Sequence, residues 1–188
     1  MPKNYRNSNF SPLFWPIKLK KDAVYILDET LLPQKVHYIK AKTLNQICSA
    51  IKNMKTRAVG QVILVMYAFI WVIKKNKSQK NLTSLLNKTA KALNSTRPTL
   101  SFHFLTDMVL SWHKAGLPLE KTILGFLEGL KNKRIGQAQK AVELLKDKDV
   151  ILTHCNISGL MPLIGQIGLK NKKKFKFYAT ETRPYLQG

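Results

Sequence analysis

The sequence DVILTHCN at residues 149–156 joins a short apolar run to a polar turn. The run at 150–152 is β-branched and aliphatic, which predicts a strand buried on both faces. Residues 153–159 then supply His, Cys, Asn, Ser and Gly in quick succession. Apolar residues follow roughly at helical spacing, at Leu160, Ile164, Ile167 and Leu169. We therefore expect a strand, a turn and a helix in this order.

The turn places Cys155 where a parallel strand ends and a helix begins. Open α/β sheets bind ligands at this edge. The free N–H groups and the positive end of the helix dipole favour anions there, including a thiolate over a thiol. Cys155 is therefore a candidate reactive residue. The alternative is a small buried side chain, which is the commoner fate of a lone cysteine.

Composition indicates a folded protein in a reducing compartment. The 188 residues are 45% hydrophobic, enough for one or two domains with a buried core. Cys48 and Cys155 are far apart and form no CxxC or zinc-type spacing, which argues against a disulfide scaffold or a metal site. The first fifteen residues lack the apolar segment of a secretory signal, so we expect a cytoplasmic protein.

The formal net charge is +22. Such an excess favours a polyanionic partner, for example nucleic acid, anionic lipid or phosphorylated metabolites. The lysines are nevertheless spread along the chain among many Asn and Ile residues, and AT-rich codon usage produces the same pattern. Nucleic-acid binding is one interpretation of the charge, and codon bias is the other.

The first part of the chain predicts an arm and a hairpin. Residues 1–22 mix three prolines with Asn, Ser and Lys, which indicates an irregular arm. The runs at 24–27 and 36–39 predict two antiparallel strands joined by a long loop.

Helices are expected to follow the hairpin. Thr43 and Gln46 form a capping-box pair, and the helix they start carries Cys48 on its apolar face. Nearly every residue at 62–73 is apolar. Because a membrane span needs about 20 such residues, we expect this helix to be buried in a bundle, with no membrane contact.

Further helical patterns occupy residues 82–93, 102–112, 119–131 and 134–146. Pro98 fits the first turn of a helix, so Arg97 is expected at a helix start. There its guanidinium and free backbone N–H groups can share one anion. The alternative is a solvated surface arginine.

The predicted fold class is α+β followed by α/β: an N-terminal β-hairpin with a helical bundle, then the incomplete start of a Rossmann-like parallel sheet. The strands at 149–153 and 175–180 and the helix at 159–169 form one βαβ unit. Two parallel strands with one crossover helix leave faces and edges uncovered, so we expect further chain or a partner to complete the sheet. The predicted domains are an irregular arm at 1–22, a hairpin and helical domain at 23–147, and the βαβ unit at 148–188.

Four motifs together resemble one family. They are LDETLLP at 27–33, STRPT at 95–99, THCN at 153–156 and ETRPYLQG at 181–188. In order and spacing they resemble methylthioribose-1-phosphate isomerase, over roughly residues 24–188. This family belongs to a superfamily with the regulatory subunits of eukaryotic initiation factor 2B and ribose-1,5-bisphosphate isomerase.

The resemblance implies a helical domain before a Rossmann-like domain and an aldose–ketose isomerisation of a pentose 1-phosphate in methionine salvage, without cofactor or metal. It implies that Cys155 is the catalytic cysteine, that Arg97 binds the phosphate and that Gln187 contacts the sugar. It also implies that Arg57, with Ala58 and Val59, corresponds to the Arg-Gly-Ala-Pro substrate loop of the family.

Two departures from the family pattern qualify this expectation. The substrate loop reads RAVGQ at 57–61, without the glycine and the proline of the family. The catalytic aspartate and an Asn-Lys pair of the family lie beyond residue 188, and Asp147 and Asp149 precede the strand, so no acid clearly replaces it.

The expected function is therefore an isomerase-family protein that is weak or inactive alone, as a homodimer or with a partner that completes the sheet. The alternatives are a non-catalytic subunit of the initiation-factor-2B type, acting through protein contacts, and a relative of ribose-1,5-bisphosphate isomerase.

Overall fold

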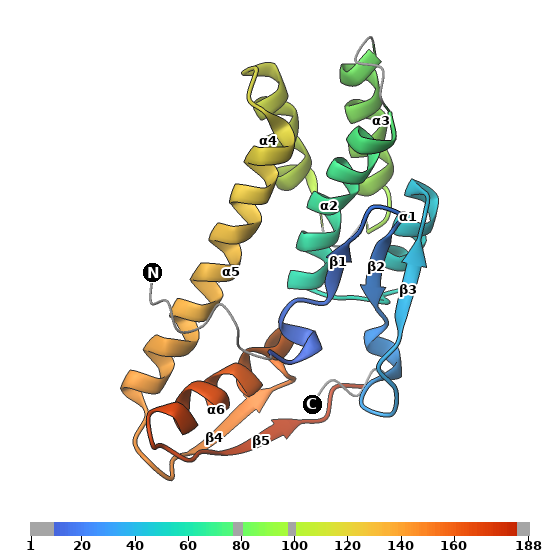
Figure 1. Ribbon diagram of the computed structural model, residues 1–188. Coiled ribbons are helices and arrows are strands. Elements are labelled where there is room, and N and C mark those ends of the chain that lie inside the picture. Colours follow the sequence, from blue (N-terminus) through green and yellow to red (C-terminus); the bar gives the residue numbers. More distant parts are fainter. Residues whose placement is uncertain (1–9, 77–80, 98–100, 184–188) are drawn as a thin grey trace. The chain divides into compact units, whose positions relative to one another are not determined.

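The computed structural model describes residues 10–76, 81–97 and 101–183 (Figure 1). Packing groups the chain into two compact units, one formed by residues 16–130 and the other by residues 1–15 with 131–188. The domain boundaries expected from the sequence, after residues 22 and 147, stay a prediction.

A three-stranded antiparallel sheet opens the unit at 16–130. Strands β2 (Val24–Leu27) and β3 (Tyr38–Ala41) form the expected hairpin, with Val24 opposite Ala41. Strand β1 (Ile17–Leu19) pairs with the other edge of β2. The prediction of an irregular arm is thus wrong for β1, whose Ile17 is fully buried and lies opposite Ile26. This burial of apolar side chains explains why so short a segment forms a strand.

Helices follow the sheet, beginning with α1 (Leu44–Lys52), α2 (Val59–Lys75), α3 (Leu82–Asn94) and α4 (His103–Lys114). The capping box is confirmed, because Thr43 Oγ1 accepts from the N–H of Gln46 and Gln46 Oε1 accepts from the N–H of Thr43. Helix α2 is buried along almost its whole length and contacts α1, α3 and α4, as expected for the middle of a bundle. Among the described residues, none of the helices is both long and apolar enough to cross a membrane.

Two helix boundaries differ from the prediction. Helix α4 begins at His103, whose N–H donates to Ser101 Oγ, so Arg97 does not stand at its first turn. Ser101 thereby supplies an acceptor for one of the N–H groups that lack a partner within the first turn of α4. Residues 119–131 and 134–146 form one helix, α5 (Leu119–Leu144), because Gly136 lowers helix propensity without breaking the hydrogen-bond ladder.

The second unit contains the expected βαβ arrangement. Strands β4 (Val150–His154) and β5 (Lys176–Thr180) pair in parallel, and α6 (Leu160–Lys170) connects them. Figure 1 shows α6 lying along one face of this sheet. The core of the unit is made by the arm, α5 and α6 through Phe14, Ala138, Val142, Leu163, Ile164 and Ile167.

Strand β4 is not buried on both faces, contrary to the prediction. Val150 is 63% exposed and Leu152 is 74% exposed, whereas Thr153 points inward and is 7% exposed. Side chains alternate along a strand, and the core cluster of this unit packs against the sheet through Phe177, so the side chains of β4 on the other face are exposed to water. Tyr178, which pairs with Leu152, is 49% exposed on the same outer face.

Candidate functional site

Cys155 occupies the turn between β4 and α6, as the sequence predicts. The side chain is half-buried, and the N–H of Ile157 donates to its Sγ atom at 3.4 Å. A single turn of 3₁₀-helix at Ile157–Gly159 leads into α6. A backbone donor therefore reaches the sulphur at the carboxyl end of a parallel strand, where ligands of open α/β sheets bind.

The backbone of this turn is strained. The φ angles of Cys155, Ile157 and Ser158 are 57°, 47° and 52°, and that of Gly159 is 77°. Residues other than glycine disfavour this region by roughly 1–2 kcal/mol each. Such conformations persist only where surrounding contacts hold them, and they concentrate at functional sites.

Arg134 of α5 is a site-supporting residue that the sequence reasoning missed. It is 5% exposed, and its Nη2 atom donates to the carbonyl oxygen of Ser158 at 2.6 Å. Burial lowers the pKa of Arg134 to about 10, which still leaves the guanidinium charged at neutral pH. The only sequence signal was that Arg134 is an arginine at the end of a lysine-rich stretch, which does not distinguish it from a solvated cation.

The loop before α2 carries the other predicted site residues. Arg57 is buried, Val59 is half-buried and Ala58 is exposed. Ala58 has φ 39°, in the half of conformational space that favours glycine. The resemblance implies a glycine at this position, and glycine would adopt this φ angle without strain.

Glu29, in the hairpin loop, supports the Arg57 loop from within. Its Oε1 atom accepts hydrogen bonds from Thr56 Oγ1 at 2.7 Å and from the N–H of Arg57 at 3.1 Å. Burial raises the pKa of Glu29 above its ordinary value, and the two donors oppose this rise. The backbone that presents Arg57 is thus tied to the LDETLLP motif.

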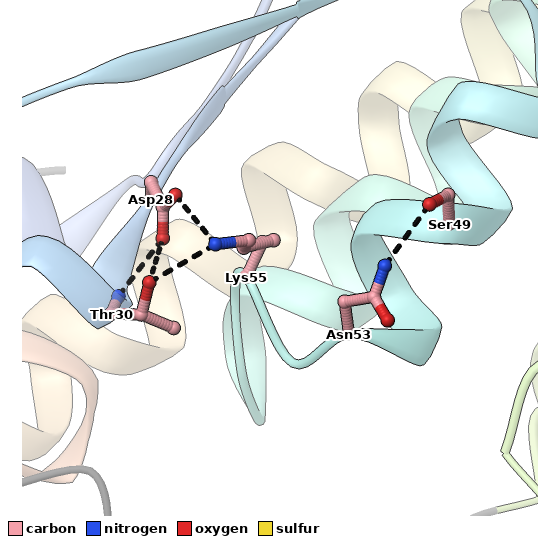
Figure 2. Close-up of polar contacts among 5 residues, drawn as sticks. All are labelled: Asp28, Thr30, Ser49, Asn53 and Lys55. Carbon is pink, nitrogen blue, oxygen red and sulfur yellow. Dashed lines mark hydrogen bonds and ion pairs between the residues drawn. The ribbon is translucent and has the colours of Figure 1, made fainter.

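Figure 2 shows a second tie between the same segments. Lys55 Nζ lies 3.0 Å from Asp28 Oδ2 and 3.2 Å from Thr30 Oγ1. The carboxylate of Asp28 also accepts from the N–H of Thr30 at 3.1 Å. Burial raises the pKa of Asp28, but these hydrogen bonds and the Lys55 cation outweigh it and lower the pKa overall. The hairpin loop and residues 55–57 therefore form one hydrogen-bonded support.

Arg97 contacts Met54, which lies three residues before Arg57. The Sδ atom of Met54 contacts Arg97 Nη1 and accepts from Gln61 Nε2 at 3.6 Å. Gln61 also donates to the carbonyl oxygen of Thr56 at 2.9 Å. The unit at 16–130 thus gathers two of the predicted substrate-binding segments, one from before α2 and one from after α3.

The remaining predicted residues lie elsewhere. Cys155 belongs to the other unit, and Gln187 lies outside the described residues. At the ends of β4 and β5, His154 Nδ1 lies 2.7 Å from Thr180 Oγ1, which adds a polar pair to the sheet edge that carries Cys155. Throughout the described ranges, no three His, Cys, Asp or Glu side chains gather as a metal site would require.

Comparison with known proteins places this geometry in a family. The model of the Initiation factor 2 subunit family matches residues 54–188. The chain is 31% identical over 191 residues to the methylthioribose-1-phosphate isomerase of Thermosipho melanesiensis, covering 89% of this chain and 54% of the relative. A methylthioribose-1-phosphate isomerase of Carboxydothermus hydrogenoformans is 28% identical over 198 residues, covering 94% of this chain and 55% of the relative.

Solved structures share the fold. The crystal structure of 5-methylthioribose 1-phosphate isomerase from Pyrococcus horikoshii OT3 superposes with a TM-score of 0.71 at 20% identity, covering 96% of this chain and 57% of that one. Translation initiation factor eIF-2B, subunit delta, from A. fulgidus gives 0.75 at 24% identity, covering 93% and 56%. The chain spans about half the length of the curated relatives it matches. Because the family model covers most of the chain, this protein belongs to the Initiation factor 2 subunit family.

Proposed function

We propose that the chain is the sugar-phosphate-binding part of an aldose–ketose isomerase of the methylthioribose-1-phosphate isomerase type, weak or inactive alone. The observation that carries this proposal is the contact of Arg97 with Met54, three residues before Arg57. Two guanidinium groups in one unit suit a phosphate, because arginine presents a planar fork of donors to phosphate oxygens.

In the proposed reaction, the pentose 1-phosphate becomes the corresponding ketose 1-phosphate with no net change of composition. The bond between C1 and the ring oxygen breaks, and the hydrogen on C2 moves to C1 as a proton or a hydride. C1 is thereby reduced and C2 is oxidised to the ketone, while the proton of the C2 hydroxyl ends on the former ring oxygen. Cys155 is the proposed group for this transfer, because its sulphur lies at a ligand-binding sheet edge with a backbone donor beside it. Gln187 is proposed to contact the sugar.

A second acid–base group is needed for efficient transfer. Within the described residues, Asp147 and Asp149 precede β4, and their carboxylates accept backbone hydrogen bonds from Lys174 and Lys146. They are therefore engaged at the opposite end of the strand from Cys155. This supports the proposal of little turnover by these residues alone.

Calorimetric titration of the purified chain tests the proposal, with methylthioribose 1-phosphate and ribose 1,5-bisphosphate as separate ligands. We expect the first to bind, and Arg97→Met to weaken binding at least tenfold, since a lost charged hydrogen bond is worth about 1.5–3 kcal/mol. Lys88→Met removes one exposed cation from α3 and serves as the control, with less than a twofold effect. No heat of binding with either ligand would contradict the proposal, and preference for the bisphosphate would favour the ribose-1,5-bisphosphate isomerase relative.

The second candidate is a non-catalytic subunit of the initiation-factor-2B type. It is favoured by the alanine at φ 39° in the substrate loop and by the outer face of β4 and β5, which suits a protein partner. A homodimer, or a complex with a chain that completes the sheet, is proposed in either case. Light scattering after gel filtration gives the mass; a dimer that binds neither sugar phosphate would support this candidate. A cytoplasmic location remains part of both proposals.

A further inference from the structure

We infer that Arg134 and the N-terminal segment 11–15 position the turn that carries Cys155. We call Arg134 with residues 11–15 the turn support. Its catalytic meaning rests on the proposed function, in which Cys155 moves a hydrogen between two substrate carbons.

The first observation is the hydrogen bonding of Arg134. Its Nη1 atom donates to the carbonyl oxygen of Phe14 at 2.8 Å, and its Nη2 atom donates to the carbonyl oxygen of Ser158 at 2.6 Å. Within the described part of the chain, no carboxylate forms an ion pair with it. A buried cation is costly unless hydrogen bonds compensate for lost water, so both carbonyl oxygens are needed. The planar guanidinium fixes the distance between the two acceptors, which a lysine ammonium cannot do.

The second observation is the direct contact between the segment and the turn. A Cβ atom added to Gly159 would lie 2.7 Å from the nitrogen of Phe14 and 2.8 Å from the carbonyl carbon of Leu13. The two backbones therefore touch where only glycine fits. Phe14 is fully buried, and its ring lies 4.7 Å beneath the guanidinium of Arg134. Ser11 Oγ accepts from the N–H of Leu13 at 3.4 Å and so fixes the segment locally.

The third observation connects this support to the sulphur. Ile157, whose N–H donates to Cys155 Sγ, has φ 47°, and Ser158 beside it has φ 52°. Without an external restraint these residues would relax toward ordinary φ values. The N–H of Ile157 would then leave the sulphur, and the backbone donor that positions Cys155 would be lost. Arg134 holds Ser158, the next residue, so it acts on the sulphur through the backbone.

Alkylation of the two cysteines by iodoacetamide, followed by mass spectrometry at pH 7 and pH 10, tests this inference. The variants are Arg134→Lys, which keeps the charge but loses the fork, and Arg134→Met. Lys133→Met, at an exposed neighbouring position of α5, is the matched control. Cys48 is an internal reference, because it lies in the other unit.

We expect Arg134→Lys to slow alkylation of Cys155 at least threefold at pH 7 and at pH 10, because the sulphur loses the backbone donor that positions it. The rate at Cys48 and the Lys133→Met variant should match the unmodified protein. A role confined to packing would instead expose Cys155 and raise its rate at both pH values, which would overturn the inference. Equal rates at pH 7 would overturn it as well.

If the variants do not fold, hydrogen exchange of backbone amides in the unmodified protein tests the same inference. We expect the amides of Leu13, Phe14 and Ile157 to be protected to a similar degree, because one contact holds them. Exchange of the Ile157 amide within seconds would overturn the inference. Neither measurement uses a substrate, so they can succeed when the sugar-phosphate titration fails, and each failure is then assigned to its own proposal.

Discussion

The hydroxyl of Thr56 donates a hydrogen bond of 2.7 Å to the buried carboxylate of Glu29. The two residues belong to segments 27 positions apart, the hairpin loop and the loop before α2. This hydrogen bond links the LDETLLP motif to the segment before α2. The motif therefore supports the backbone on which Arg57 lies.

Replacement of Glu29 by glutamine should change how stability depends on pH. Burial raises the pKa of Glu29 above 4.5, so the folded protein binds a proton more tightly than the unfolded chain. The contribution of Glu29 to the free energy of unfolding is therefore fully present below pH 4.5 and is lost as the pH rises through the raised value. Urea unfolding between pH 4 and pH 8 measures the difference in free energy of unfolding between the unmodified protein and Glu29→Gln. We expect this difference to fall as the pH rises, because the other titrating groups are common to both proteins. Parallel curves for the two proteins would contradict the raised pKa.

Replacement of Gly60 by alanine should destabilise the same support. An added Cβ atom would lie 2.0 Å from Thr56 Oγ1 and 2.9 Å from Pro16 Cγ. Thr56 cannot turn away without depriving Glu29 of a donor, so we expect a loss of about 2–3 kcal/mol. Gly136→Ala is the control, because its Cβ atom would meet nothing within 4 Å and should stabilise α5 by about 0.5–1 kcal/mol. Similar melting shifts for the two variants would refute this account.

Replacement of Ala58 by glycine should be tolerated or favourable. The φ of 39° strains an alanine, whereas glycine adopts it freely. The gain is partly offset by the greater freedom of glycine in the unfolded chain, which leaves about 0.5 kcal/mol of net stabilisation. Ala92→Gly, in the regular helix α3, should instead lose about 1 kcal/mol. Chemical denaturation measures both, and a loss at position 58 as large as at position 92 would argue against the strained conformation.

Removal of the capping hydroxyl by Thr43→Ala should destabilise α1 by about 1 kcal/mol, because the N–H of Gln46 then lacks its acceptor. Ser84, exposed within α3, provides the comparison: Ser84→Ala should change stability by less than about 0.5 kcal/mol. Thermal unfolding followed by circular dichroism distinguishes the two, and an unchanged melting temperature for Thr43→Ala would contradict the importance of this cap.

Local signals in the sequence predicted the elements whose cause is local. The capping box at Thr43 and the apolar run of α2 could be predicted from neighbouring residues alone. The order of strand, turn and helix around Cys155 could be predicted in the same way. Strand β1 was missed because three residues between prolines and lysines carry almost no periodicity, and its stability comes from pairing with β2.

Side-chain roles that depend on distant contacts could not be predicted in the same way. Arg134 contacts Phe14 and Ser158, which lie 120 and 24 positions away in the sequence. Nothing in its immediate neighbours distinguishes it from the exposed lysines around it. The same holds for Met54, which contacts Arg97, a residue 43 positions away in the sequence.

The uncovered side of β4 and β5 has a consequence for handling the protein. Val150, Leu152 and Tyr178 expose apolar surface to water, while the net charge of +22 makes the molecules repel one another. Added salt shortens the reach of that repulsion to about 8 Å at 0.15 M, without weakening apolar attraction. Concentrated stocks should accordingly be clear in dilute buffer and turn turbid as sodium chloride is added, the reverse of ordinary salting-in.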